Sequence, residues 1–283
     1  MKTTMVHRST NRIKQAVLAA AAVLASIASA TAGPINTDVA FTPRAGGGIL
    51  RLQYVYLEAD GHGAVGQINA STFRSTLVYG ATERVALFFS VPYQNRQIDV
   101  SPAAGGRFED AHDGIGDMTA LVKYRFWQRD SGTLETNRWA VLGGVSIRSG
   151  DSDFTTDSYD PIIGTAWSRR ANRTRWDADL LYRFGTGSGQ FGHDAIRYDL
   201  AWSYRIYPAI YEPGQIASID TVAELNGLYR TDGSHEVYLS PGLQLSGDGW
   251  VLETSLQLPI IREVDDDRAE NDFRFVFGIR FHW

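Results

Sequence analysis

The sequence contains no cysteine, which excludes a structural disulfide, an iron–sulfur cluster, a thiolate zinc site and a cysteine nucleophile. It also lacks an excess of basic residues. The 27 Lys and Arg against 32 Asp and Glu give a net charge of -5, so a nucleic-acid partner is not expected. After the first thirty or so residues, no apolar run approaches the roughly 18 residues of a transmembrane helix. The hydrophobic content of 43% nevertheless excludes a disordered chain.

Residues 1–32 predict a signal peptide. A basic stretch that begins at Lys2 precedes the apolar run "AVLAAAAVLASI", and small residues follow it. The alternative, a membrane-anchoring helix, is disfavoured because this run is too short to span a bilayer. We expect cleavage after Ala30 or Ala32, then a pre-barrel segment over residues 33–45 and one domain over residues 46–283.

Helical periodicity is scarce in the remaining chain, whereas alternation with a period of two is frequent. In "RYDLAWSYRIY", for example, Leu200 and Trp202 share one face, and Arg197 and Asp199 share the other. About twelve such segments, separated by turn signals, predict antiparallel strands. Their charged faces fit two environments: a soluble sandwich whose charges meet water, or a transmembrane barrel whose charges meet the lumen.

Two patterns favour the barrel. Tyr and Trp lie mainly at strand ends, where two interfacial girdles would form: Tyr79, Tyr93, Trp127, Trp139, Trp176, Tyr207, Trp250 and Trp283. Short connections also alternate with longer ones, among which we place residues 59–70 and 101–116. Residues 129–137 break the pattern as a long connection on the short side. The predicted fold is all-β, a single closed antiparallel transmembrane barrel of about twelve strands with short periplasmic turns and longer extracellular loops.

The charged faces supply the candidates for lining a pore, and many of them should pair across neighbouring strands. They are Arg74, Lys123, Arg125, Asp177, Asp179, Arg183, Arg197, Asp199, Arg205, Glu224, Arg230, Arg274 and Arg280. The pre-barrel segment either plugs the lumen or lies in the periplasm. Pro92 and Pro259 each predict a bulge or bend, because proline removes a ladder donor. Such a bend either opens the wall toward the membrane or is an irregularity without function.

The last predicted strand, "NDFRFVFGIRFHW", carries six large apolar residues on one face. Gly278, Phe281 and Trp283 resemble the C-terminal signal that outer-membrane barrels present to the barrel-assembly machinery. The segments "VPYQNR" and "GIGDMTALVKYRF" resemble the outer-membrane family labelled MetA-pathway of phenol degradation. This resemblance implies a Gram-negative outer-membrane channel for aromatic or other hydrophobic compounds, and it transfers no functional residues.

Other chemistry is weakly indicated. Gly114-Ile115-Gly116 lacks the third glycine and the helix of a nucleotide loop. Three histidines with an acidic neighbour, His112, His193 and His235, leave a surface hydrolase as an alternative. No distinctive serine nucleophile accompanies them, so we do not expect an enzyme. Two groups of acidic residues are interpreted as solvated loop tips: one is Asp151, Asp153 and Asp157, and the other is Asp265, Asp266, Asp267 and Glu270. No metal or cofactor is therefore expected.

The sequence therefore predicts a channel for passive uptake of small solutes, possible substrates being aromatic or hydrophobic compounds. The alternatives are the surface hydrolase and a structural or adhesive barrel without transport. Expected partners are outer-membrane lipid and lipopolysaccharide, the barrel-assembly machinery and a small-molecule solute.

Overall fold

The computed structural model describes residues 33–60, 65–100, 108–131, 135–188, 192–212, 214–264 and 269–283. The predicted signal peptide lies outside these residues. Within them, no helix is long and apolar enough to cross a membrane. The strands are β1 (Gly48–Asp60), β2 (Val65–Gly80), β3 (Val85–Val100), β4 (Phe108–Ile115), β5 (Met118–Asp130), β6 (Glu135–Ile147), β7 (Asp160–Ala171), β8 (Thr174–Arg183), β9 (Ala195–Tyr207), β10 (Ser218–Arg230), β11 (His235–Ser246), β12 (Trp250–Glu263) and β13 (Glu270–His282).

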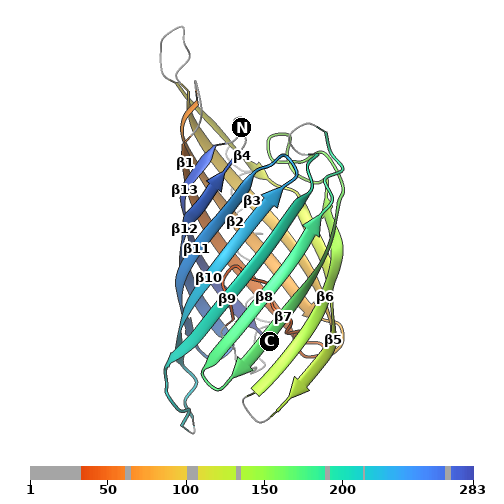
Figure 1. Cartoon of the computed structure of the whole chain (residues 1–283), viewed down its shortest axis with the longest axis vertical. Coiled ribbons are helices and arrows are strands. Elements are labelled where there is room, and N and C mark those ends of the chain that lie inside the picture. The colour runs from red at the N-terminus through yellow and green to blue at the C-terminus, as the bar shows by residue number, and fades with distance from the viewer. Residues whose placement is uncertain are drawn as a thin grey trace, which may run out of the picture.

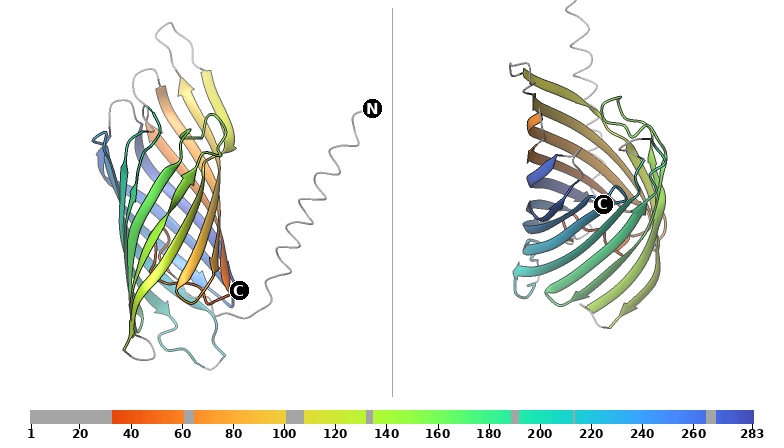
Figure 2. Two further views of the ribbon diagram at one scale, coloured as in Figure 1. Left: turned by 90° about the vertical axis from the view of Figure 1, so that its right-hand side faces the viewer. Right: turned by 45° about the horizontal axis from the view of Figure 1, so that its top comes forward.

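The strands form one antiparallel sheet that closes on itself (Figure 1). Strand β1 pairs with β2 on one side and with β13 on the other, so the sheet has no free edge at its ends. Strands β4 and β5 both pair with β3, which makes them one wall strand interrupted at Gly116 and Asp117. The predicted fold is confirmed: a closed antiparallel barrel of 12 strands. The strands are steeply tilted in both side views (Figure 2).

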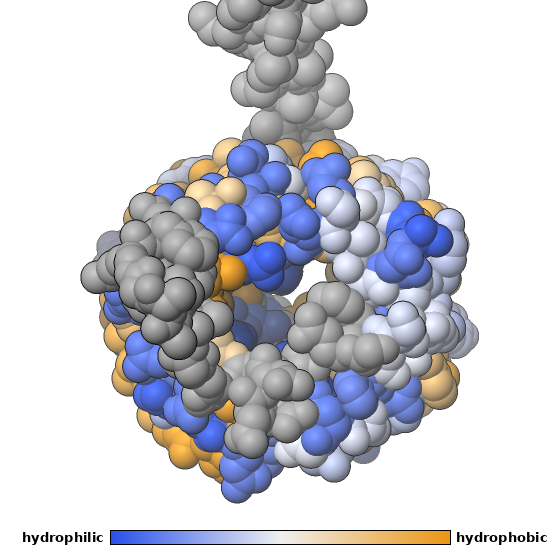
Figure 3. All heavy atoms as spheres, turned by 90° about the horizontal axis from the view of Figure 1, so that it is seen from above, coloured by the Kyte–Doolittle hydropathy of each residue, from blue (hydrophilic) through white to orange (hydrophobic). Residues whose placement is uncertain are grey.

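Polarity is inverted relative to a soluble protein. The outward positions carry apolar side chains that are open to the surroundings, including Leu180, Leu200 and Phe277. The inward positions carry buried charges, including Asp177 and Glu224. Apolar side chains outside and charges inside suit lipid around the barrel and exclude the sandwich alternative. Seen along the barrel from the end with the longer loops, the molecule is a ring with a hollow centre and many hydrophilic residues (Figure 3).

Several strands are longer than the sequence predicts. Residues 65–70 extend β2, and residues 108–115 form β4, although both stretches were expected in loops. Their alternation is weak because their outward positions carry polar residues, such as Asn69 and Asp113, in place of apolar ones. On the other side, β5 and β6 extend toward each other, so the connection that was expected over residues 129–137 shrinks to residues 131–134. The exception that was expected there disappears, but the connection between β9 and β10, residues 208–217, is a longer one on the same side.

The barrel closes where the two ends of the sheet meet. The backbone N–H of Gly48 donates to the carbonyl of Trp283 at 3.0 Å, and the N–H of Trp283 donates to the carbonyl of Gly48 at 3.1 Å. The indole of Trp283 covers Gly48 so closely that a Cβ there would lie 2.3 Å from the ring. Glycine is thus required at this seam.

Candidate functional site

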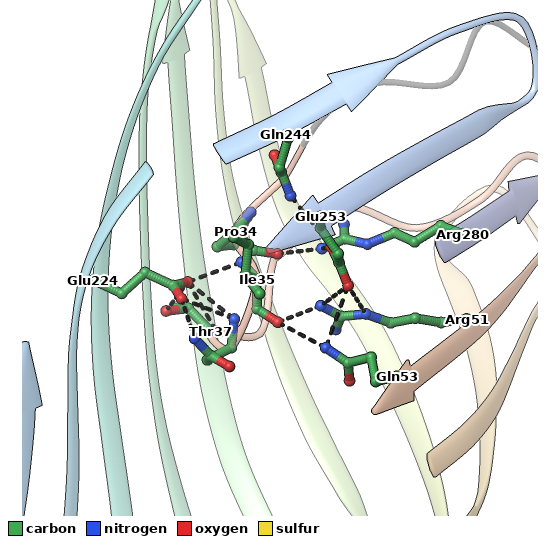
Figure 4. A network of polar contacts seen from close by, with 10 residues as sticks. Pro34, Ile35, Thr37, Arg51, Gln53, Glu224, Gln244, Glu253 and Arg280 are labelled. Atoms are coloured by element: carbon green, nitrogen blue, oxygen red, sulfur yellow. Dashed lines mark hydrogen bonds and ion pairs between the residues drawn. The ribbon is translucent and has the colours of Figure 1, made fainter. Parts of the chain in front are cut away.

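A segment that precedes the first strand lies inside the barrel. We name residues 33–42 the inner segment. It crosses the lumen and contacts the inner wall on nearly every side, from β1 and β13 to β6 and β10 (Figure 4). At its end, the Thr42 hydroxyl donates to the carbonyl of Glu83 in the turn between β2 and β3 at 2.7 Å. Of the two placements that the sequence left open, the structure shows the one inside the lumen.

Apolar contacts hold the inner segment at two points. Ile35 packs with Val222 of β10 and Val276 of β13, and Ala40 packs with apolar wall residues of β6 and β7, including Ala140 and Leu142. Both Ile35 and Ala40 are fully buried. Burial of an isoleucine side chain stabilises by about 1.5–3 kcal/mol. Gly242 makes room for it, because a Cβ there would lie 2.6 Å from Ile35.

Glu224 of β10 is the strongest polar anchor. Its carboxylate accepts hydrogen bonds from the backbone N–H groups of Ile35, Asn36 and Thr37 at 3.0–3.2 Å, and from the side chains of the last two residues. These three residues bend around the carboxylate, and their amide dipoles compensate its buried charge (Figure 4). Hydrogen bonds to a charged group contribute about 1.5–3 kcal/mol each, so Glu224 fixes the position of the bend.

Glu253 of β12 organises the opposite wall. It forms ion pairs with Arg51 of β1, at 2.7 Å, and with Arg280 of β13 (Figure 4). Both guanidinium groups also donate to the inner segment: Arg51 to the carbonyl of Ile35 and Arg280 to the carbonyl of Pro34. The carbonyls of Pro34 and Ile35 therefore each have a cationic donor, and the two cations share one carboxylate.

The third attachment lies on β7, β8 and β9. The Asp38 side chain pairs with Arg197, and its backbone N–H donates to Asp179 at 2.5 Å. Burial would raise the pKa of Asp38, but the charges of Arg197, Lys123 and Arg51 and the hydrogen bond from Arg197 together outweigh it and hold the pKa below the usual range of an aspartate. Farther along, the N–H of Ala40 donates to Ser168 Oγ at 2.9 Å.

Between the inner segment and the wall lies a cavity of about 320 Å³, at the end of the lumen where β1 begins and β13 ends. Its lining combines cationic side chains, chiefly Lys123, Arg51 and Arg280, with the aromatic rings of Phe41 and Phe88. The inner segment thus narrows the lumen without filling it.

All thirteen residues that were predicted to line a pore lie at inward positions of the strands. Most are paired, as expected. Arg183 contacts Asp160 at 3.3 Å, Arg230 contacts Glu236 at 3.1 Å, and Arg274 contacts Glu236 at 3.6 Å. Arg125 and Arg205 donate instead to carbonyls near the short turns, at 2.6 and 3.1 Å. Asp177 pairs with Arg175, and Asp199 and Asp179 pair with Arg197.

Two of the predicted cations stand apart. Within the described part of the chain, neither Arg74 nor Lys123 makes a hydrogen bond or an ion pair. Arg74 is exposed, and it lies opposite Gln53, whose side chain reaches the inner segment, so Arg74 projects into the open lumen. Lys123 is 1% exposed and lines the cavity. Of the predicted pore-lining cations, these two carry no hydrogen bond or ion pair within the described residues.

Both prolines coincide with irregular pairing. At Pro92, β3 changes partner from β5, which pairs up to Thr119, to β4, which starts at Ile115. At Pro259, the register between β11 and β12 shifts by one residue. Pairing of β12 with β13 also stops at Gln257 and Arg274, although both strands continue.

The wall is therefore split at one place. Above Gln257, the rest of β12 pairs with β11 alone, and the first residues of β13 pair with β1 alone. An ion pair between Arg262 and Asp272, at 3.1 Å, spans this split. An unpaired ladder of this kind costs little only where water or protein satisfies its polar groups.

The histidines do not assemble a catalytic group in the described ranges. His112 contacts Asp110 at 3.0 Å and Asp153 at 2.7 Å, and His235 contacts the Tyr198 hydroxyl at 2.6 Å. No serine hydroxyl hydrogen-bonds to any of the three histidines in this part of the chain. The three histidines lie on separate elements and share no pocket in the described part of the chain.

The acidic loop residues also disperse. Asp151 accepts from the N–H of Ile115 at 2.7 Å, Asp153 holds His112, and Asp157 pairs with Arg148. Residues 265–267 lie outside the described ranges. Among the described residues, no cluster of three or more acids or histidines could hold a metal ion.

The terminal pattern has structural roles whether or not it is an assembly signal. Gly278 lies between Gln53 and Glu253, where a Cβ would approach a Glu253 oxygen to 2.9 Å. Phe281 pairs with Leu50, and Trp283 closes the seam with Gly48. The signal itself stays a prediction.

Sequence reasoning left two functional features unassigned. The inner segment shows no periodicity, so its ten residues gave no hint of their contacts. Arg51 and Gln53 of the first strand, which bind the inner segment, are not among the predicted pore-lining residues. The one available signal was the density of charges at inward positions, since buried charges need partners that the wall alone does not supply.

A closed 12-stranded barrel with apolar exterior and charged interior defines the class of outer-membrane β-barrels. Within that class, the chain matches the family described as "Putative MetA-pathway of phenol degradation" over residues 45–258, and it belongs to this family. The family resemblance of the sequence is thereby confirmed. No curated protein matches the chain.

One solved structure agrees on the fold, and two others are more distantly similar. The COG4313 outer membrane channel from Pseudomonas putida F1 is similar with a TM-score of 0.55 at 13% identity, covering 89% of this chain and 100% of that one. The NanC porin follows with a TM-score of 0.46 at 12% identity over 82% and 98% of the two chains. A Pseudomonas aeruginosa FadL homologue gives 0.38 at 9% identity over 90% and 96%. These neighbours are channels and porins, and at such identities the first shows the fold alone.

Proposed function

We propose that this protein is a Gram-negative outer-membrane channel for passive uptake of small solutes, with the inner segment setting the width of its path. The observation that carries the proposal is the cavity of about 320 Å³ that persists beside a segment bound inside a charge-lined lumen. A barrel that serves only adhesion has no need for a free arginine in its lumen, whereas Arg74 offers one to a passing solute. The family and the fold of its neighbours support transport.

The proposal includes the expected partners of such a channel. These are outer-membrane lipid and lipopolysaccharide around the apolar exterior, and the barrel-assembly machinery that would read Gly278, Phe281 and Trp283. The signal peptide over residues 1–32 would direct the chain across the inner membrane.

Aromatic or hydrophobic compounds are the second part of the proposal, and the split between β12 and β13 favours them. A solute of low polarity that enters from outside would leave the lumen through the wall and avoid the charged inner segment. Pro259, which cannot donate to a neighbouring strand, lies in the part of β12 that pairs with β11 but not with β13.

Liposome swelling tests the proposal. The purified protein, reconstituted without its signal peptide, should admit small uncharged solutes such as glycerol faster than empty liposomes, and should admit larger sugars such as sucrose much more slowly. The heat-unfolded protein, added in the same amount, is the matched control. If no small solute enters faster than in that control, the channel function is wrong and the adhesive or hydrolytic alternative gains support.

A further inference from the structure

The cavity beside the inner segment has an unusual charge balance. Four cationic residues from the wall line it, namely Arg51, Lys123, Arg175 and Arg280, and Asp38 is the one acidic side chain among its described lining residues. That carboxylate already pairs with Arg197. A cavity between a channel wall and the segment inside it can be filled by water alone. Water does not require an excess of positive charge, so this excess needs a specific explanation.

Lys123 is the central observation. Its side chain is 1% exposed, and its Nζ lies 4.5 Å from the centre of the Phe88 ring. Asp38, Asp177 and Asp179 are the acids whose charges reach it, and none forms an ion pair with it among the described residues. A buried ammonium group without a counterion is costly, and the cost is relieved when an anion occupies the space beside it.

The neighbouring cations share too few carboxylates to serve as their own counterions. Arg175 pairs with Asp177, whereas Arg51 and Arg280 share Glu253 as their one carboxylate partner among the described residues. The Nε atom of Arg280 and the Nε2 atom of His282 are buried without a hydrogen-bond partner. The cavity therefore combines surplus positive charge with donors that have no acceptor, which is the chemistry of an anion site.

The apolar lining narrows the class of anion. Phe88 and Phe41 offer ring surfaces beside the cations. A cavity of about 150 Å³ binds benzene in another protein, so about 320 Å³ accommodates one aromatic ring with an acidic substituent. A cation would be repelled here, and a small inorganic anion would leave the ring surfaces without a contact.

We propose that the cavity is a binding site for a single-ring aromatic carboxylate. The carboxylate lies at Lys123 and the donors of Arg280 and His282, and the ring lies along Phe88. The proposal rests on the proposed function, because it places a solute site on the path that the inner segment narrows. The site is built jointly by the wall and the inner segment, so it also couples occupancy of the cavity to retention of that segment.

Isothermal titration calorimetry with benzoate tests this site in the purified protein in detergent. Benzoate should bind saturably, with one molecule per barrel. Benzyl alcohol, which keeps the ring, and acetate, which keeps the charge, should each bind at least about tenfold more weakly. Benzylamine, which reverses the charge, should not bind. This ligand series uses only the wild-type protein, so its result does not depend on whether a variant folds.

Lys123→Met keeps the volume of the stem and removes the charge, and it should weaken benzoate binding by about tenfold or more. Arg148→Met is the matched control, because it removes a cation from the β6–β7 loop, and it should bind as the wild type does. Heat-modifiable migration on a gel reports that each variant is folded.

Three results would overturn the proposal: no benzoate binding, equal binding of benzoate and benzyl alcohol, or unchanged benzoate binding by folded Lys123→Met. Inorganic phosphate binding as tightly as benzoate would reduce the site to a general anion site and would also refute it. Liposome swelling is measured separately, so loss of the site and loss of channel function are distinguishable.

Discussion

Single carboxylates decide where the inner segment lies. Glu224 is almost fully buried, yet it pairs with no cation among the described residues. It is stabilised instead by three backbone N–H groups of one bend. A carboxylate with this set of donors specifies a backbone conformation as well as a position, which an arginine–carboxylate pair does not.

Glu224→Gln should therefore loosen the inner segment. The amide keeps the shape, but it offers one acceptor oxygen and turns an amino group toward donors, at a cost of about 2 kcal/mol or more. The chain has no cysteine, so Val39→Cys provides a single labelling site on the segment. Maleimide should react about tenfold faster with this cysteine when Glu224→Gln is present.

The control for this change is Glu58→Gln on β1, whose side chain contacts Gln67 far from the segment. It should leave the labelling rate of Val39→Cys unchanged. Equal labelling rates for Glu224→Gln and the parent would show that the bend is held by its apolar contacts alone.

At the scale of elements, alternation predicted nearly every strand, because a lipid-facing row and a lumen-facing row impose strict chemistry on each residue. Prediction failed where that constraint ends. Strand β4 and the start of β2 carry polar residues at outward positions, so their sequences do not alternate. The inner segment was also beyond prediction, because its bonds run to residues such as Glu224, which lies 187–189 positions away in the sequence.

The family motif contains one aspartate, Asp117, whose structural role the sequence alone did not explain. Asp117, in "GIGDMT", interrupts the wall strand and accepts bonds from Gly150 at 3.0 Å and from the backbone of Thr156 at 2.7 Å. It thereby fastens the β6–β7 loop over the irregularity at Pro92. The sequence placed this aspartate at a strand start, but nothing in it identified the loop that it holds.

The split between β12 and β13 should be visible in hydrogen exchange. Amides of residues 258–263 that point toward β13 have no strand partner there, whereas those of residues 251–257 do. The former should exchange at least about a hundredfold faster in the reconstituted barrel. The backbone amides of β10, a strand that is paired on both sides, serve as the reference for exchange rates. Equal protection along β12 would contradict a split wall and remove the support for a lateral route.

At the scale of the whole molecule, the inner segment narrows a closed barrel that is otherwise large enough to conduct. The wall holds its shape through its complete ring of strand pairs, and the inner segment adds a removable constriction. Its apolar and ionic contacts are distributed over many strands, so it should stay bound on the timescale of a passing solute.

Single-channel conductance in a planar bilayer, compared between the mature protein and the same protein lacking residues 33–42, tests this relation most directly. We expect a small conductance for the full chain and a severalfold larger one without the inner segment, because the wall is intact and the constriction is gone. Heat-modifiable migration confirms that both barrels are folded. Identical conductance in the two folded proteins, or none in either, would contradict the account.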